Sequence, residues 1–434
     1  MLLEFKVSNY KSIAEEQTIS FVPSKAQSDY PDNILHNGKH EGLNVLALYG
    51  PNNSGKSNFL KAIATLDQLI FLAGSSHSTA RLPYDPNLLI EGYKKKPTEF
   101  EITFVIEGVR YRYGVTYNES LIIGEWLYRK KSGREVELFF REKDVIQVSE
   151  GFKGKSRLIE TAIEATRENA LFLSFCDILN VQEAKLIFSW FRNLISVDGL
   201  DTTDQELNTI TLLESDIVYR EKIIQLLRGL GLGFIDLAIL KKTFDPMLLP
   251  EFLDRETKES LIQKLSGKTG VQVNTIRHIY KEDGNISEDT MMWPLDERES
   301  AGTKKAFSLS GPAIYSLLNG GILVIDEIEA KLHTKITSRI VELFLSEETN
   351  PKGAQLLFAT HDTNLLREST LRRDQINFTE LNHLKATELY SLSDFKYFNG
   401  NKERPDTDKE KRYLEGRYGA IPKIGAIQDF LKAV

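Results

Sequence analysis

The sequence is short of the features that mark secreted, membrane-spanning and zinc-binding proteins. Among its 434 residues there is one cysteine, Cys176, so an intramolecular disulfide and a cysteine-based zinc cluster are excluded. No apolar run reaches about 18 residues and no signal peptide is evident, so we expect neither secretion nor a membrane partner. These absences fit a reducing, cytoplasmic environment.

An excess of basic residues is also missing. The net charge is −7, which disfavours a protein that coats DNA but leaves room for a local basic patch. Among the seven histidines only His36 and His40 have a ligand-like spacing, and they lack the glutamate of H-E-x-x-H, so we expect no metal site there. The helical middle of the chain has no sustained heptads, so a long coiled-coil arm is not expected.

What the sequence does contain is a complete phosphate-binding motif. Residues 43–49 are a short apolar run that is typical of a buried parallel strand. Residues 50–57 then match G-x-x-x-x-G-K-[ST] without a mismatch, and residues 58–70 place their apolar side chains on one helical face. Strand, glycine loop and helix are the context in which this motif binds a nucleotide.

Each part of this loop has a chemical task. Gly50 and Gly55 let backbone N–H groups turn toward a phosphate, and the helix N-terminus adds partial positive charge. Lys56 can reach the β- and γ-phosphates, and the Ser57 hydroxyl can ligate Mg²⁺. We therefore expect ATP and Mg²⁺ as cofactors, with the nucleotide bound by Gly50, Asn52, Asn53, Ser54, Gly55, Lys56, Ser57 and Asn58.

A second chemical centre lies far along the chain. Residues 320–325 are an apolar strand that leads into Asp326 and Glu327. An aspartate in this place is the usual Mg²⁺ partner in a P-loop enzyme, and an adjacent glutamate can polarise the attacking water as a general base. Asp326 is therefore assigned to the metal and Glu327 to the water. Another buried strand, residues 354–360, leads into His361. Because this strand follows the Asp-Glu strand in the sequence, His361 is a further candidate for the catalytic site.

Two further segments are candidates for contacts with the phosphates. Ser300, Gly302 and Thr303 open a helical run, and the amides of a helix start suit a γ-phosphate, although the same string is also an ordinary N-cap. Lys11 follows an expected strand at residues 2–7 and would lie near the nucleotide if that strand runs beside the phosphate loop. By composition alone, Lys11 is an ordinary surface lysine.

Together these motifs resemble the ABC-class ATPases of the SMC, RecF and OLD type. The matching parts are Asn9 to Ser12, the phosphate loop 50–57, the signature Ser300 to Lys304, Asp326-Glu327, and His361 in the place of the switch histidine. More closely, the chain is similar to compact ATPases of bacterial anti-phage systems, the RloA, AbiL and AriA group, over residues 326–333, 355–362, 373–378, 388–392 and 413–422. The resemblance covers both ends of the chain well and the middle poorly.

The resemblance implies a head-to-tail homodimer, or a higher oligomer of dimers. In it, the signature Ser300 to Thr303 of one subunit closes over ATP that Lys56 and Ser57 of the other subunit hold. The signature reads Ser-Ala-Gly-Thr rather than the transporter Ser-Gly-Gly-Gln, which argues against a transporter subunit. A Q-loop glutamine cannot be placed, and Glu99 and Glu125, the candidates for its role, are better explained as acids on strand faces.

The expected fold is α/β, a P-loop NTPase of the ABC-ATPase head type with an antiparallel β subdomain and a mainly helical insertion. Residues 1–150 and 270–434 should form the head, and residues 151–269 the insertion. Four antiparallel strands are expected in the first part, at 99–106, 110–117, 120–128 and 135–140.

Three functions stay open at this point. The leading one is an ATPase, turning ATP and water into ADP and phosphate, that serves as the switch of an anti-phage system. It would control a separately encoded effector, a nuclease or toxin, since the chain has no HNH pattern of its own. The second is a DNA-repair ATPase of the RecF or SMC kind that acts directly on DNA. The third is a scaffold whose hydrolysis is negligible, against which the intact Glu327 speaks.

The C-terminal segment 394–422 leaves a contact with nucleic acid or a partner open. Interspersed acids favour a solvated tail instead. Its basic residues include Lys402, Arg404, Lys409, Lys411, Arg412 and Arg417.

Overall fold

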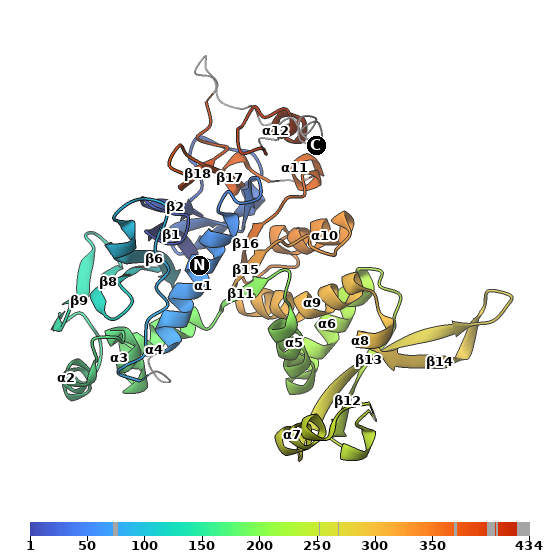
Figure 1. The fold of residues 1–434 in the computed structure, drawn as a ribbon. Helices are drawn as coiled ribbons and strands as arrows, with labels where there is room; N and C mark the ends of the chain where they lie inside the picture. Colours follow the sequence, from blue (N-terminus) through green and yellow to red (C-terminus); the bar gives the residue numbers. More distant parts are fainter. Residues whose placement is uncertain are drawn as a thin grey trace, which may run out of the picture. The chain divides into compact units, whose positions relative to one another are not determined.

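The computed structural model describes residues 1–72, 77–250, 252–267, 269–368, 371–396, 404 and 407–422. The chain forms two compact units. Unit 1 comprises Met1–Leu200 and Tyr315–Val434, and unit 2 comprises Asp201–Ile314. Figure 1 shows both strands and helices in each unit, so the chain is a mixed α/β protein with several sheets.

The first sheet of unit 1 is antiparallel and has seven strands in the order β10-β9-β8-β7-β6-β1-β2. It contains the four strands that the hairpin spacing predicts, which are joined by tight turns such as the one at Glu107 and Gly108, where both φ angles are positive. The bounds are β1 (Leu2–Ser8), β2 (Gln17–Ser20), β6 (Thr98–Ile106), β7 (Val109–Tyr117), β8 (Ile122–Lys130), β9 (Val136–Glu142) and β10 (Val145–Val148).

The second sheet of unit 1 has six strands in the order β11-β15-β16-β5-β17-β18. All neighbours are parallel except β18, which runs antiparallel to β17. The central strands β5 and β16 are buried along their whole length, because a parallel sheet is covered on both faces. The bounds are β5 (Val45–Tyr49), β11 (Leu194–Asp198), β15 (Ile322–Asp326), β16 (Gln355–Ala359), β17 (Ile376–Leu381) and β18 (Thr387–Ser391).

Helix α1 (Lys56–Leu72) lies between the two sheets of unit 1 and builds their common core (Figure 1). Its predicted apolar face is buried: Phe59, Ile63, Leu66 and Ile70 are at most 1% exposed. Helix α10 (Thr334–Leu345) contacts β5 and β16, and α2 (Ser156–Ala165), α3 (Phe172–Ile178) and α4 (Gln182–Phe191) add apolar side chains to the core that α1 shares with the antiparallel sheet.

Unit 2 contains a three-stranded antiparallel sheet in the order β12-β13-β14, together with helices. Figure 1 shows β13 and β14 as a long hairpin. The bounds are α5 (Thr203–Ser215), α6 (Ile217–Gly229), β12 (Asp236–Thr243), η3 (Pro246–Leu248), α7 (Arg255–Leu265), β13 (Thr269–Tyr280), β14 (Ile286–Pro294) and α8 (Leu295–Arg298). Helix α9 (Ala301–Asn319) begins in this unit and ends in unit 1.

The compact unit 2 differs from the expected insertion at residues 151–269 at both ends. Residues 151–200 lie in unit 1, because α3 and α4 pack into its core and β11 pairs with β15. At the other end, unit 2 continues to Ile314, because β14 pairs with β13.

The remaining elements are short. They are η1 (Pro31–Asn33), β3 (Ile34–Asn37), β4 (His40–Leu43), η2 (Tyr93–Lys95), α11 (Asn364–Glu368), η4 (Arg373–Gln375) and α12 (Lys409–Leu414). Within the described ranges, the helices lack the length and apolar character that crossing a lipid bilayer requires.

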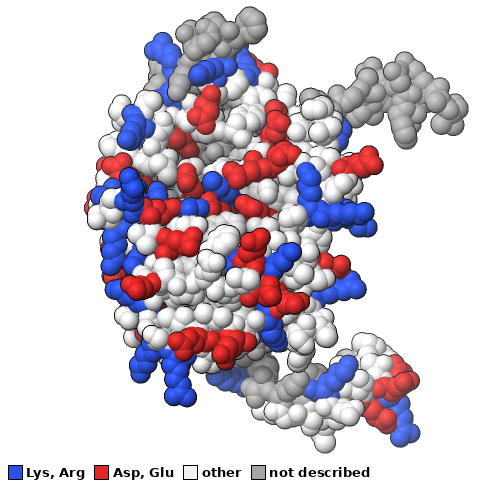
Figure 2. Space-filling view, turned by 90° about the vertical axis from the view of Figure 1, so that its left-hand side faces the viewer, with Lys and Arg blue, Asp and Glu red and all other residues white. Residues whose placement is uncertain are grey.

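Charges of both signs are mixed on the side of the molecule shown in Figure 2, where lysines and arginines alternate with acids. Ion pairs on the seven-stranded sheet illustrate the mixture. Arg112 lies 2.8 Å from Glu135 and 2.7 Å from Glu101, and Arg110 lies 3.1 Å from Glu135. This arrangement fits a solvated face rather than a track for a nucleic-acid backbone.

Candidate functional site

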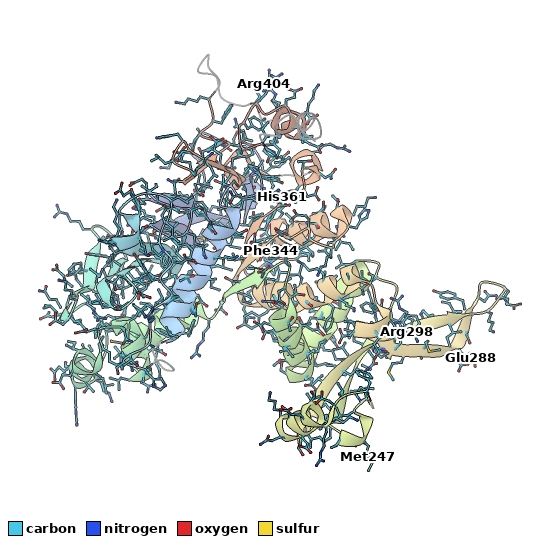
Figure 3. The ribbon with its side chains drawn as sticks, viewed as in Figure 1. Met247, Glu288, Arg298, Phe344, His361 and Arg404 are labelled. Carbon is cyan, nitrogen blue, oxygen red and sulfur yellow. The ribbon has the colours of Figure 1, made fainter. Side chains whose placement is uncertain are left out.

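The sequence motifs of unit 1 meet at one edge of the parallel sheet. Strand β5 leads into the phosphate loop, β15 ends in Asp326, and β16 is followed by Thr360 and His361. His361 is labelled in Figure 3 beyond the end of β16. The three strands are parallel neighbours, so their carboxyl ends lie at the same edge, which is where ligands bind in open α/β sheets.

The two motif glycines are required by space as well as by backbone angle. Gly55 has a φ of +101°, and a Cβ atom there would lie 2.0 Å from the Thr387 Oγ1 atom and 2.9 Å from the Ser12 Oγ atom. A Cβ atom on Gly50 would lie 2.5 Å from the Thr379 carbonyl oxygen. Any side chain at these positions would push the loop away from β17 and β18.

Hydroxyl groups tie the phosphate loop to the strands around it. The Ser54 Oγ atom lies 2.6 Å from the Thr379 Oγ1 atom, and the Thr387 hydroxyl donates to the Ser54 carbonyl at 3.0 Å. On the other side, the Asn58 amide donates to the Ser12 hydroxyl at 2.6 Å, and Ser12 and Thr387 share a hydrogen bond of 2.7 Å. Ser12, Thr379 and Thr387 were not predicted as site residues, because single hydroxyl residues carry no local pattern.

Lys56 folds back over its own loop. Its side chain donates to the carbonyl oxygens of Gly50 at 2.8 Å and Pro51 at 3.2 Å, and its Nζ atom lies 3.1 Å from the His361 Nε2 atom. Lys56 is 5% exposed. The phosphate-reaching cation of the motif therefore lies in direct contact with the predicted switch histidine.

Carboxylates face this cation from the end of β15. Burial lowers the pKa of Lys56 to about 8, although the nearby charges of Asp326, Glu329 and Glu327 oppose that change. Burial likewise raises the pKa of Glu327, and the charges of Asp326 and Glu329 raise it further. Glu327 also has a φ of +46°, which is uncommon for a side-chain-bearing residue and marks the turn at the end of β15.

The donors at this edge fit an Mg²⁺ ion that is shared with phosphates. The Asp326 Oδ1 atom is buried and has no hydrogen-bond partner among the residues that the structure describes, which leaves one carboxylate oxygen for a cation. Ser57, at the start of α1, supplies a hydroxyl group. In the described ranges, no group of three or more histidine, cysteine or acidic side chains could hold a metal ion. Mg²⁺ is commonly bound by one or two carboxylates together with phosphates and water, and here it would neutralise phosphate charge.

Two acids that the sequence analysis did not assign lie beside this centre. Glu329 accepts hydrogen bonds from the Thr360 hydroxyl at 2.7 Å and from the His361 backbone N–H at 2.6 Å, so it fixes the turn that carries His361. Asp198, at the end of β11, is in register with Asp326 on β15. The spacing Asp-Glu-x-Glu could have drawn attention to Glu329, whereas the pairing of β11 with β15 carries no signal in the sequence.

The structure gives Lys11 a partner other than a nucleotide. Its ammonium lies 2.5 Å from an Asp85 carboxylate oxygen, and its backbone N–H donates to the Asp85 carbonyl at 2.7 Å. The neighbouring Ser12 does reach the start of α1 through Asn58. The segment after β1 thus lies beside the phosphate loop, while a contact between Lys11 and a nucleotide stays a prediction.

The other candidates from the sequence fall into two groups. Asn52 and Asn53 are exposed at the tip of the phosphate loop. The two Q-loop candidates serve structure: Glu99 accepts a hydrogen bond from the Thr116 hydroxyl at 3.1 Å, and the fully buried Glu125 accepts two backbone N–H groups at the start of α3.

The signature residues cap a helix in unit 2. The Ser300 hydroxyl accepts a hydrogen bond from the Thr303 backbone N–H at 3.1 Å and lies 3.0 Å from the Thr303 Oγ1 atom. Ser300 thus caps α9, and Gly302 lies in its first turn. Binding of a γ-phosphate by Ser300, Gly302 and Thr303 stays a prediction.

The residue before the signature is held by the β13–β14 hairpin. The Glu299 side chain is 5% exposed and accepts hydrogen bonds from Thr275 at 2.7 Å, Trp293 at 2.9 Å and two nitrogens of Arg277, the shortest at 2.7 Å. Burial works against the charge, but these hydrogen bonds outweigh it and lower the pKa of Glu299. The start of α9 is therefore fixed to the hairpin by one carboxylate.

The chain matches the model of a known protein family. No curated protein is significantly similar to the chain. A family model described as "AAA domain, putative AbiEii toxin, Type IV TA system" matches residues 45–151 and 209–367, which is more than half of the chain. The matched ranges include the phosphate loop, Asp326, Glu327 and His361. The chain therefore belongs to this AAA-domain family of P-loop ATPases.

Proposed function

We propose that the chain binds and hydrolyses ATP and works as the dimeric switch of a bacterial anti-phage defence system. In this proposal it controls a separately encoded effector, a nuclease or toxin. One observation carries the ATPase part: the phosphate loop, the Asp326-Glu327 pair and His361 lie at the same edge of one parallel sheet. These groups are the ones that hold phosphates, bind Mg²⁺ and orient water in P-loop enzymes.

The defence part of the proposal is supported by two likenesses. The family description names the AbiEii toxin of type IV toxin–antitoxin systems, and the sequence resembles the RloA, AbiL and AriA group. The finer features of this proposal are an ABC-type head and a head-to-tail dimer. Both features are supported by the signature string at Ser300 to Thr303. This string caps the N-terminus of α9, and a helix N-terminus can bind a phosphate.

The test of the ATPase and the dimer uses the purified chain and its Glu327→Gln variant. We expect the wild-type protein to release phosphate from MgATP, and the variant to bind ATP, release almost none and accumulate as a dimer. The matched control is Glu348→Gln, an exposed glutamate in the loop before β16. Hydrolysis by Glu327→Gln at the wild-type rate would contradict the assignment of the general base.

The test of the effector is affinity purification from the native host with the neighbouring genes intact and ATP present. A stoichiometric nuclease or toxin-like partner would support the switch function and identify the effector. Recovery of the ATPase alone, with hydrolysis that rises when DNA is added, would favour a RecF- or SMC-like enzyme that acts directly on DNA.

A further inference from the structure

The C-terminal part of unit 1 contains a cavity of about 430 Å³ with a cationic lining. Arg404 lies at this end of the molecule (Figure 3). The charged residues that line the cavity are Arg404, Lys411, Arg412 and Arg417, with Asp408 and Glu415. Four cations and two acids give the lining a net charge of +2, in a chain whose overall net charge is −7.

Both acids of the lining have local structural tasks. Asp408 caps α12 by accepting the Lys411 backbone N–H at 2.9 Å, and Glu415 accepts a hydrogen bond from the Arg417 Nε atom at 2.7 Å. The Arg417 guanidinium retains its four other N–H donors beyond that bond. The acids therefore hold the backbone and one arginine in position, and they leave the lining with a net charge of +2.

The wall of the cavity is anchored to the core of unit 1. The Tyr413 ring of α12 stacks on Phe378 with 5.5 Å between ring centroids and meets Tyr49 edge-on at 5.9 Å. Its hydroxyl donates to the Ala420 carbonyl at 2.9 Å. Because Phe378 and Tyr49 belong to β17 and β5, helix α12 with its cationic residues packs against the parallel sheet.

We propose that this cavity binds a phosphate group of a ligand other than the ATP at the phosphate loop. Its volume lies within the range of about 300–1,000 Å³ of ordinary ligand sites, and arginine guanidinium groups recognise phosphate through paired N–H donors. The same chemistry fits a phosphodiester of a nucleic-acid backbone and the terminal phosphates of a small molecule.

A contact links the cavity to the predicted switch histidine. Glu410, one residue before Lys411, accepts a hydrogen bond from the Thr363 hydroxyl at 2.8 Å. Thr363 lies two residues after His361, and the Tyr49 hydroxyl donates to the Asp362 carbonyl at 3.4 Å in the same turn. A ligand that shifts α12 would therefore move the turn that carries His361 and change ATP hydrolysis. This last step rests on the proposed function, whereas binding in the cavity does not.

The binding test is made in a Lys56→Ala background, so that the phosphate loop does not contribute. The probes are a fluorescent single-stranded DNA and an RNA of the same sequence, each of about 20 nucleotides, and inorganic pyrophosphate as a competitor. The test variant is Arg404→Gln with Lys411→Gln. The matched control is Lys131→Gln with Arg134→Gln, an exposed pair in the turn between β8 and β9.

We expect the test variant to bind the oligonucleotide about tenfold or more weakly than the control. The slope of log affinity against log salt concentration should also be shallower by about one, because phosphate contacts are lost. Binding of pyrophosphate alone, lost in the test variant, would point to a small phosphate ligand. Equal affinity of test and control variants, or no binding of any probe, would overturn the proposal.

A second readout separates this inference from the proposed function. With wild-type Lys56 restored, we expect the oligonucleotide or pyrophosphate to change the rate of ATP hydrolysis, and the Arg404→Gln, Lys411→Gln variant to keep its basal rate but lose that response. If the protein binds the probes but shows no hydrolysis at all, the proposed ATPase function fails while the phosphate site stands. If hydrolysis is present but the cavity variants bind normally, only the phosphate site fails.

Discussion

The ammonium of Lys56 lies 3.1 Å from the Nε2 atom of His361. Burial lowers the pKa of both groups, and the charge of Lys56 lowers the pKa of His361 further. Both effects favour the neutral form of His361, in which an unprotonated Nε2 atom can accept a hydrogen bond from Lys56. A γ-phosphate bound at the loop would compete with His361 for the same ammonium, which links nucleotide binding to the position of the histidine.

Lys56→Ala should abolish useful ATP binding. The variant loses the motif's phosphate-reaching cation, and the loss of a buried, hydrogen-bonded charge partner costs about 2–4 kcal/mol, or about 30- to 1,000-fold in affinity. The measurement is titration calorimetry with MgATP. Lys61→Ala, an exposed lysine one and a half turns along the same helix, serves as the control and should bind as the wild type does. Unchanged affinity of Lys56→Ala would refute the assignment of the loop.

Lys56→Met should stabilise the protein without added nucleotide, in a pH-dependent way. The folded-state pKa is lowered from 10.5 to about 8, so the unfolded chain binds the extra proton between these values. Burying the charge therefore costs up to about 3 kcal/mol below pH 8, and the cost fades as the pH rises toward 10.5. Urea denaturation at a series of pH values measures the effect.

The matched control is Lys61→Met. It removes a lysine whose side chain is exposed, so no buried charge is lost. The advantage of Lys56→Met over Lys61→Met should be largest near pH 7 and shrink at high pH. A difference between the two variants that is the same at pH 7 and pH 10.5 would rule out a buried charge at Lys56.

Glu327→Gln should slow hydrolysis by about 10²- to 10⁴-fold with little change in ATP affinity, because general-base catalysis contributes about this much. Burial raises the pKa of Glu327, so the wild-type rate should fall with decreasing pH at a higher pH than an ordinary glutamate would give. Single-turnover hydrolysis across a pH series measures both effects. Glu348→Gln should keep the wild-type rate and profile, and an unshifted profile in the wild type would place the base elsewhere.

The local patterns of the sequence predicted the strands of unit 1 that carry the candidate site residues. The phosphate loop stands between a strand and a helix, and α1 buries the face that its apolar spacing indicates. These features are local, because a motif and its flanking periodicity lie within about 30 residues. The four hairpin strands were predicted for the same reason: each pairs with the next strand along the chain.

Features that depend on distant pairing could not be predicted. Asp198 lies in register with Asp326 only because β11 pairs with β15, which is more than a hundred residues further along the chain. Ser12 and Thr387 meet at 2.7 Å from opposite ends of the sequence, and no local pattern links the two positions. The same holds for the sheet of unit 2, in which β12, β13 and β14 pair across intervening segments.

Gly55→Ala should disrupt the phosphate loop through a collision rather than through backbone strain alone. A Cβ atom at Gly55 would lie 2.0 Å from the Thr387 Oγ1 atom, while the strain of a positive φ costs about 1–3 kcal/mol by itself. Gly92→Ala is the matched control, because Gly92 has a φ of +86° and no atom of the described residues lies within 4 Å of its Cβ position.

Thermal melting and nucleotide titration of both variants separate the two costs. Gly92→Ala should lose a little stability and bind ATP normally, whereas Gly55→Ala should lose more stability and most of its affinity for ATP. Equal losses in the two variants would mean that the contact with Thr387 is not what requires glycine at position 55.

Glu299→Gln should weaken unit 2 and slow ATP hydrolysis without weakening ATP binding. The substitution breaks the paired hydrogen bonds with Arg277, and losing one partner of such a shielded charge pair costs about 2–4 kcal/mol. Because Glu299 directly precedes the cap of α9, the start of that helix loses its fixed position. The phosphate loop lies in unit 1, so affinity for ATP should hold while kcat falls. Glu297→Gln, an exposed neighbour, is the control.

The pH dependence distinguishes this charge pair from a packing effect. The folded-state pKa of Glu299 is lowered, so its contribution to stability is present above the unfolded value of 4.5 and is lost as the pH falls through the folded value. Urea denaturation should therefore show a wild-type advantage over Glu299→Gln at neutral pH that disappears in acid. A double-mutant cycle with Arg277→Gln measures the coupling directly. Additive losses in that cycle would show that Arg277 does not hold the start of α9 through Glu299.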